Sequence, residues 1–461
     1  MKNSGNSPTH EYIRENGDRF QAELLEFLSI PSVSTDSSFK DDIGRAAVFV
    51  RDRLLDAGAD RAELYPTSGH PVVYGEKIVD PHAPTLLCYG HYDVQPADPY
   101  DLWKTPPFVP DIRNGRVYAR GSADDKGQVY MYVKALETLC RTGRNFCNFK
   151  FLIEGEEEIG SPSLPSFLES HKSLLSSDGI LISDTSFISE DLPSLTIGVR
   201  GLAYLEIRVE GPNRDLHSGE YGGAVENPVH VLCKILSSLK DSAGRITIPG
   251  FYEEVISLSD VDRKVYRSIP FNEEGFKEKL GVGEVFGETG YSTLERIGTR
   301  PSLDIHGIWG GYIQEGAKTI LPSQAHAKLS MRLVPNQRGE DIMEKTLRHL
   351  KSICPPTVKL SVHPHHSSEA FVSSTEDPTY KSASKALGHI FACTPVGVRC
   401  GGSIPIVPVL HRVLGLSPVL LGFGLPEDAI HSPNESYALS QYWKGIETLC
   451  CLFEDRLSSS F

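Results

Sequence analysis

The sequence lacks the features of secreted and membrane-spanning proteins. Its nine cysteines are odd in number and include no CxxC pair, so neither a disulfide framework nor a thiolate zinc cluster is indicated. No run approaches the roughly 18 consecutive apolar residues that span a bilayer. Residues 1–20 contain no apolar segment of a secretory signal peptide. We therefore expect a cytoplasmic protein with no membrane partner.

Positive charge is also scarce. Lysine and arginine number 46 against 60 aspartates and glutamates, which gives a formal net charge of -14. A negative surface repels the phosphates of nucleic acids and of anionic lipids, so we expect neither as a partner. The charge favours solubility and does not identify a substrate.

Apolar runs alternate with helical patterns over the first 190 residues. Three short apolar runs, each bounded by polar residues or glycine, are typical of buried strands in a mostly parallel sheet: 85–89, 149–153 and 179–182. Helical patterns occupy 20–28, 46–59 and 127–139. Alternation of this kind predicts an α/β domain with helices on the faces of the sheet.

The pattern changes after residue 200. Apolar and polar residues alternate from 202 to 211 as in a half-buried antiparallel strand, and further strands and helices are expected at 228–239, 303–312, 326–334, 341–353 and 358–362. The first pattern returns from about residue 367, with helices at 380–390 and 437–453 and an apolar run at 419–423. We predict an α/β domain of residues 1–199 and 367–461, interrupted by an inserted α+β domain of residues 200–366. Residues 251–300 indicate no function.

A histidine and an aspartate follow the first apolar run. His91 and Asp93 lie two residues apart, so a strand would turn them to one face. They lie at the carboxyl end, where open α/β sheets collect their functional groups. A metal-binding histidine usually donates its second ring N–H to a carboxylate or carbonyl, and Asp93 is close enough to receive it. The pair by itself is more typical of a buried structural histidine.

Adjacent carboxylates, Asp124 and Asp125, precede the helical pattern at 127–139. Such residues commonly cap a helix by accepting hydrogen bonds from its free N–H groups. The alternative is that Asp124 bridges two cations, one on each carboxylate oxygen.

Four glutamates, Glu154 and Glu156 to Glu158, follow the run at 149–153, and Asp184 and His431 follow two further runs. Crowded carboxylates repel each other unless solvent or cations relieve them, so a solvated acidic turn is one interpretation. Convergence of histidines and carboxylates on one sheet edge favours a second interpretation, a binding site for a pair of divalent ions. We expect zinc, with manganese or cobalt as alternatives. Paired ions acidify a bridging water, and an adjacent glutamate outside the ligand set can act as the base.

Eight motifs in order resemble those of the co-catalytic metallopeptidases, the family of dipeptidases, aminoacylases, carboxypeptidases and desuccinylases. They are HYDVQP, RGSADDKG, EGEEEIGS, SDTS, RDLHSGEYGG, MRLVPN, GGSIP and IHSPNE. The sequence is most similar to the dipeptidase branch, which includes cytosolic nonspecific and carnosine dipeptidases.

The resemblance implies a role for each residue of the site. His91, Asp124 and Asp184 would bind one metal ion, and Asp124, Glu158 and His431 the other. Glu157 would be the general base, and Asp93 would orient His91. Glu156 would replace Glu157 only if the register shifted by one residue. The family also has a cis peptide bond after the bridging aspartate, here Asp124–Asp125.

The inserted domain would be the lid and dimerisation domain of a homodimer. His217 would reach the partner's active site and stabilise the oxyanion, and Arg332 would bind the substrate carboxylate. Thr319, His366 and Ser403 would make further substrate contacts. Without the family, His217 is more typical of a structural histidine and Arg332 of an exposed strand residue.

We therefore predict metal-dependent hydrolysis of the amide bond of small peptides, above all dipeptides. Cys400 stands where the close dipeptidases often have glutamate, which leaves N-acyl-amino-acid amidohydrolase as the alternative. A noncatalytic scaffold protein would need neither the ligand set nor Glu157.

Overall fold

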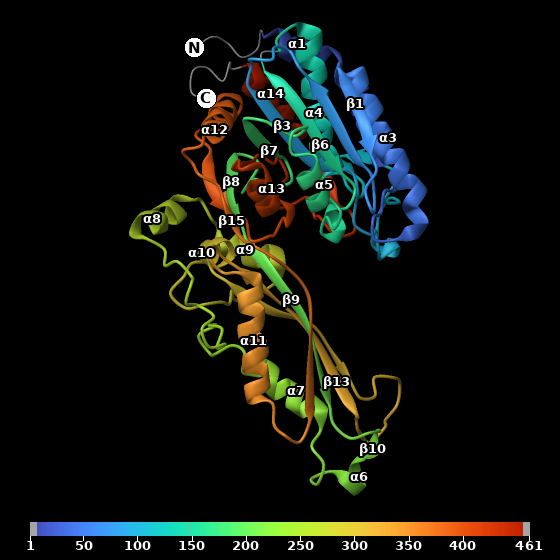
Figure 1. Cartoon of the computed structure of the whole chain (residues 1–461), viewed down its shortest axis with the longest axis vertical. Coiled ribbons are helices and arrows are strands. Elements are labelled where there is room, and N and C mark those ends of the chain that lie inside the picture. The colour runs from blue at the N-terminus through green and yellow to red at the C-terminus, as the bar shows by residue number, and fades with distance from the viewer. Residues whose placement is uncertain (1–6, 146, 455–461) are drawn as a thin grey trace. The chain divides into compact units, whose positions relative to one another are not determined.

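A computed structural model describes residues 7–145 and 147–454. The chain divides into two compact units (Figure 1). The first contains the described residues of 1–197, 373–398 and 406–461, and the second contains 198–372 and 399–405. The second unit thus takes a short segment from the C-terminal part of the chain.

A mixed sheet forms the centre of the first unit, and its middle strands are parallel. Its strands follow the order β1 (Arg61–Tyr65), β2 (Val72–Lys77), β6 (Asn148–Glu154), β3 (Thr85–His91), β7 (Gly179–Ile182), β17 (Pro418–Leu420) and β8 (Ser194–Val199). The pairs β6–β3, β3–β7 and β7–β17 are parallel. The pairs β1–β2, β2–β6 and β17–β8 are antiparallel. The predicted α/β fold with a mostly parallel sheet is confirmed.

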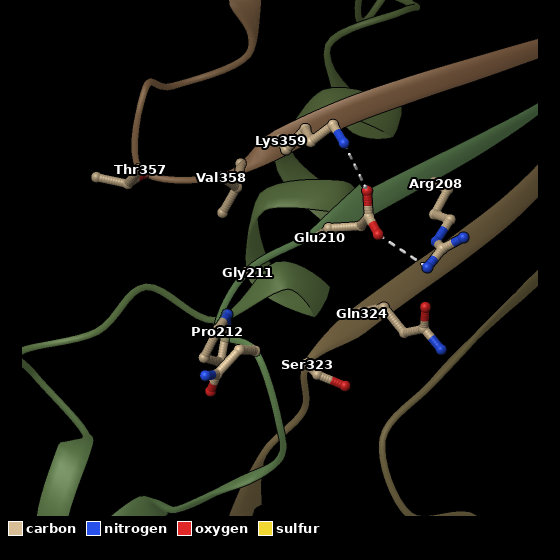
Figure 2. A pocket seen from close by; sticks show the side chains of 10 residues that line it. Arg208, Glu210, Gly211, Pro212, Ser323, Gln324, Thr357, Val358 and Lys359 are labelled. Carbon is tan, nitrogen blue, oxygen red and sulfur yellow. Dashed lines mark ion pairs between the residues drawn. The ribbon is translucent and has the colours of Figure 1, made fainter.

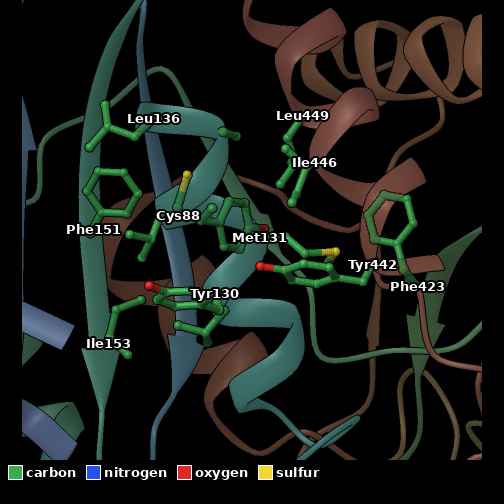
Figure 3. Close-up of a cluster of buried hydrophobic side chains, with 14 of the residues drawn as sticks. Cys88, Tyr130, Met131, Leu136, Phe151, Ile153, Phe423, Tyr442, Ile446 and Leu449 are labelled. Carbon is green, nitrogen blue, oxygen red and sulfur yellow. The ribbon is translucent and has the colours of Figure 1, made fainter. Parts of the chain in front are cut away.

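Helices cover the sheet because its strands are apolar on both faces. Helices α3 (Lys40–Asp56) and α4 (Lys126–Thr142) lie against its strands (Figure 1). Helix α14 (Leu439–Glu454) packs on α4, where Gly445 allows close approach, since a Cβ there would lie 2.1 Å from Met131 Sδ. Figure 3 shows this core, with Met131 and Leu136 of α4 beside Phe151 and Ile446.

Smaller elements complete the first unit. The remaining helices are α1 (Pro8–Glu15), α2 (Gly17–Leu28), α5 (Leu164–Ser170), α12 (Pro378–Phe391) and α13 (Ile406–Leu414), with short 3-10 turns at Ser37–Phe39 and Tyr100–Leu102. A small sheet joins β18 (Ser436–Ala438), β5 (Arg116–Tyr118) and β4 (Asp111–Arg113), while β16 (Val396–Arg399) pairs with β8. The helix expected from Tyr437 begins at Leu439, because Tyr437 pairs with Val117 in the small sheet.

The second unit is built on an antiparallel sheet. Its order is β11 (Ser302–Gly310), β13 (Gln324–Leu333), β9 (Gly201–Glu210) and β14 (Lys359–Ser368). Residues of β9 alternate strictly between buried and partly exposed. Helices α7 (Pro228–Ser237) and α11 (Gly339–Ile353) contact this sheet and share a hydrophobic core with it. The opposite face of the sheet is therefore polar.

Short elements extend the second unit. Strands β10 (Leu216–His217) and β12 (Ile320–Leu321) pair beside helix α6 (Ser218–Tyr221), and β15 (Phe371–Val372) pairs with the end of β8. Residues 251–300 contain α8 (Asp260–Ser268), α9 (Glu273–Leu280) and α10 (Thr293–Thr299). No helix in the described part of the chain could cross a bilayer.

Candidate metal centre

Adjacent parallel strands deliver the candidate ligands. Strand β3 ends at His91, and β6 ends at Glu154, with Gly155 and Glu156 between it and the 3-10 turn Glu157–Ile159. Asp184 comes two residues after β7. Because β6, β3 and β7 are parallel neighbours, their carboxyl ends meet at one edge of the sheet.

Asp124 lies between two histidines. Its Oδ1 is 3.2 Å from His91 Nε2, and its Oδ2 is 2.8 Å from His431 Nε2. His431 Nε2 is also 3.4 Å from Glu158 Oε2. Two groups result, His91–Asp124–Asp184 and Asp124–Glu158–His431, and within each the ligand atoms lie within 4.8 Å of one another. The structure brings all five predicted ligands together, with Asp124 common to both groups.

The acidic side chains of this centre are unfavourably placed without a cation. Burial raises the pKa of Glu157 and of Asp184 well above the usual range, and the neighbouring carboxylate of Asp124 adds to both. Burial also raises the pKa of Glu158. Burial opposes ionisation of Asp124 as well, but its contacts with His431 and His91 prevail and hold its pKa below the usual range. Divalent cations would relieve this crowding of buried carboxylates.

Two of the buried ligand atoms of this centre also lack hydrogen-bond partners. Among residues 7–145 and 147–454, His91 Nε2 and Glu158 Oε1 make no hydrogen bond, since the 3.2 Å contact of His91 with Asp124 does not have hydrogen-bond geometry. Buried polar atoms are nearly always satisfied. Unpaired nitrogen and oxygen atoms facing a shared aspartate fit a pair of borderline divalent ions. The His431 side chain is 52% exposed, so the centre is accessible on that side.

Asp93 contacts His91 and the two glutamates Glu157 and Glu158 of the centre. His91 Nδ1 lies 3.1 Å from the Asp93 main-chain oxygen and 3.3 Å from Oδ1. The N–H groups of Glu157 and Glu158 donate to the Asp93 carboxylate at 3.3 and 3.1 Å. Asp93 therefore fixes the turn that carries both glutamates as well as the ring of His91.

Glu156 and Glu157 have different surroundings. The carboxylate of Glu156 accepts hydrogen bonds from the N–H groups of His70 and Ser163, both at 3.1 Å. A Cβ on Gly69 would lie 1.6 Å from Glu156 Oε1, so this loop closes tightly over the carboxylate. The charge of Glu157 instead interacts with His91, Glu158 and Asp124. The surroundings therefore favour Glu157 over Glu156 as the candidate base.

Glu435 supports the candidate centre, and the sequence analysis assigned it no role. It is fully buried, and its carboxylate accepts hydrogen bonds from Arg120 Nη1 at 2.7 Å and from the N–H groups of Gly121 and Ala123, both at 2.9 Å. The N–H of Asp124 donates to it at 3.2 Å. Glu435 thus fixes the loop that presents Asp124. Its position at the end of IHSPNE was the available signal.

Two further hydrogen bonds hold the candidate ligands Glu158 and His91 in place. Gln95 Nε2 donates to Glu158 Oε2 at 2.8 Å, and the main-chain N–H of His91 donates to Asp125 Oδ2 at 3.3 Å. The Asp124–Asp125 peptide bond is cis, as the resemblance implied.

The predicted substrate residues all lie in the second unit. His217 and Thr319 are exposed neighbours: the N–H of Ser218 donates to the Thr319 main-chain oxygen at 3.1 Å. Arg332 Nη1 donates to Ser403 Oγ at 2.8 Å. His366 stacks on Tyr204, with ring centroids 5.6 Å apart. The residues thus form an exposed pair on β10–β12 and a group on the polar face of the sheet, and their roles in binding stay predictions.

Comparison with known proteins settles the family. Residues 87–455 match the model of peptidase family M20/M25/M40. The chain belongs to this family. It is 34% identical to the Cys-Gly metallodipeptidase dug1 of Schizosaccharomyces pombe, over 98% of each chain. It is 32% identical to the Beta-Ala-His dipeptidase of Homo sapiens, over 96% of this chain and 91% of that protein. The crystal structure of human carnosine dipeptidase 1 is 31% identical, with a TM-score of 0.87 and 98% of both chains covered. The predicted resemblance and the assignment to the peptidases are confirmed.

Proposed function

We propose that this protein is a metallodipeptidase that hydrolyses the amide bond of dipeptides. His91, Asp124, Glu158, Asp184 and His431 would hold two divalent ions, and Glu157 would be the general base. The observation that carries the proposal is the placement of Asp124, whose two oxygens face the histidines of different groups. Relatives named as dipeptidases, one cleaving Cys-Gly and one β-Ala-His, support the choice of substrate.

In the proposed catalytic step, one residue, Glu157, carries the proton. When bound, the two cations would acidify a water molecule and polarise the scissile carbonyl. Glu157 takes the proton from the attacking water and delivers it to the leaving amine. Asp93 holds the main chain of Glu157 in place throughout. We propose zinc as the ion, with manganese or cobalt as alternatives.

The second unit supplies substrate contacts and the dimer interface. Arg332 and Ser403 bind the C-terminal carboxylate, with His366 and Thr319 contributing further contacts. The partner subunit's His217 stabilises the oxyanion. Two observations support a homodimer: His217 is exposed, and the edge strand β11 carries exposed Ile308 and Trp309. The cytoplasmic location stays a prediction.

The alternative is an N-acyl-amino-acid amidohydrolase with the same centre. Cys400 favours it, because no carboxylate stands at that position to bind a substrate amine. The sulfur of Cys400 accepts a hydrogen bond from the N–H of Gly402 at 3.3 Å.

Amino-acid release from free dipeptides and their N-acetylated counterparts separates the two functions. The protein is reconstituted with zinc or with manganese, and the metal-free protein serves as the control. Cleavage of free dipeptides alone supports a dipeptidase. Preference for the acetylated forms makes the protein an amidohydrolase, and no turnover with both metals bound would support a noncatalytic protein.

A further inference from the structure

Two arginines lie together on the polar face of the second unit. Arg200 directly precedes β9, and period two places it on the face of Leu202 and Tyr204, away from the hydrophobic core. Arg332 of β13 is paired with Leu202 on one side and with Ser302 of β11 on the other. Both guanidinium groups are half-buried.

Both arginines are anchored on the segment 399–405. Arg200 Nε donates to the Gly401 main-chain oxygen at 2.7 Å, while its Nη1 donates to the Arg300 main-chain oxygen at 3.3 Å and lies 3.5 Å from Ser302 Oγ. Arg332 Nη1 donates to Ser403 Oγ at 2.8 Å. Within the described residues, Nη2 of Arg200 and both Nε and Nη2 of Arg332 have no hydrogen-bond partner. Arg200 therefore keeps Nη2 for a ligand, and Arg332 keeps the Nε–Nη2 edge of its fork.

Their charges are not compensated by the chain. Neither arginine forms an ion pair in the described structure. The charge of Asp304 acts on both arginines. Asp304 is exposed, however, and pairs with Lys240 at 3.4 Å. Burial and the charge of Arg332 lower the pKa of Arg200 to about 10. Burial, His365 and Arg332 lower the pKa of His366. A half-buried pair of like charges is costly unless an anion accompanies it.

At the opposite end of β9, the positive side chains do have an acidic partner in the chain. In the pocket of Figure 2, Glu210 lies between Arg208, at 2.8 Å, and Lys359, at 3.7 Å. An acid of the chain itself is therefore placed beside these cations. The pair Arg200–Arg332 has no such acid.

We propose that Arg200 and Arg332 together select peptides whose C-terminal residue carries a second carboxylate, aspartate or glutamate. This specificity rests on the proposed function, in which Arg332 binds the α-carboxylate. Arg200 then binds the side-chain carboxylate through Nη2, in a hydrogen bond strengthened by the two opposite charges.

The test compares kcat/KM for Ala-Glu and Ala-Gln, which have the same shape and differ by one charge. Wild-type enzyme loaded with metal is expected to prefer Ala-Glu by about tenfold or more, the effect of one well-placed charged hydrogen bond. Arg200→Gln brings the ratio towards one, while Arg200→Lys keeps part of it because the charge remains. Arg208→Gln, on the strand β9 that follows Arg200, is the matched control and leaves the ratio unchanged.

Two results would overturn the inference. One is equal cleavage of both peptides by wild-type enzyme. The other is an unchanged ratio in Arg200→Gln, with both substrates slowed alike, which would make Arg200 a structural residue. If the protein is not a dipeptidase, neither peptide would be cleaved, and this outcome is distinct from both results above. N-acetyl-Glu and N-acetyl-Gln carry the same comparison if the enzyme proves to be an amidohydrolase.

Discussion

Glu157 and Glu156 are neighbours in the sequence, but their carboxylates have different surroundings. The Glu156 carboxylate is bound by two main-chain N–H groups and closes a loop. The Glu157 carboxylate interacts electrostatically with the metal-ligand cluster. Of the two glutamates, Glu157 is therefore the one that we propose as the base.

We expect Glu157→Gln to lower kcat by at least about 10²-fold, because an amide cannot accept the proton. Metal content, measured on the purified protein, stays at two ions per chain. Glu156→Gln is the control and keeps most of the activity while lowering stability. Similar loss of activity in both variants would contradict the assignment of the base.

Glu154 is a buried acid of the same turn. Its Oε1 accepts hydrogen bonds from Tyr89 at 2.7 Å and Ser161 at 2.8 Å, and burial raises its pKa from 4.5 to about 8. The folded protein then keeps a proton that the unfolded chain loses above pH 4.5. Its contribution to stability is complete below pH 4.5 and is lost as pH rises to 8.

Glu154→Gln does not titrate, so it should flatten this dependence. The measurement is the free energy of unfolding of metal-free protein between pH 5 and 8, for both proteins. The wild-type curve should fall more steeply, by at most about 1.4 kcal/mol per pH unit. Parallel curves would show that Glu154 is ionised in the folded state.

Helix α4 carries charge into the core of the first unit. Lys134 donates to Glu23 and, at 2.8 Å, to Glu137, and it is buried. Glu137 also accepts from Arg19. Helix α4 is thus joined to α2 by a buried network of charges as well as by apolar packing.

Lys134→Met should destabilise the protein by about 3 kcal/mol, because it leaves carboxylates buried with fewer partners. Lys381→Met is the matched control: its pair with Glu376 is largely exposed, and the expected loss is within about 0.5 kcal/mol. Urea unfolding measures both. Equal losses would mean that the buried network contributes no more than a surface pair.

Strand ends were predictable, whereas buried partners were not. The runs before His91 and Asp184 are short and apolar, so their ends could be assigned from the sequence, and parallel strands bring such ends together. Glu435 and Arg200 depend on which distant residues surround them, and no local pattern records that. Helices α8 and α10 did have a local signal, the capping boxes Ser259–Asp262 and Ser292–Glu295, which weak hydrophobic periodicity obscured.

The metal ions should stabilise the whole molecule. Removing them with a chelator exposes the carboxylates around Asp124 to their mutual repulsion. A ligand at 100 times its Kd contributes about 2.7 kcal/mol. We therefore expect the melting temperature to fall by several degrees on chelation and to recover with zinc. Asp124→Asn, which lacks the shared charge, should show a much smaller shift; an equal shift would place the ions elsewhere.

The order of the segments along the chain bears on how the protein is made. The central strand β17 and the candidate ligand His431 both follow the second unit, whose main segment ends at residue 372. A nascent chain leaving the ribosome can complete most of the second unit while the first sheet still lacks the strand between β7 and β8. The candidate metal centre lacks His431 until the ribosome has passed the main segment of the second unit and strand β17. If His431 is the ligand that we propose, a truncated translation product that stops before it should lack peptidase activity.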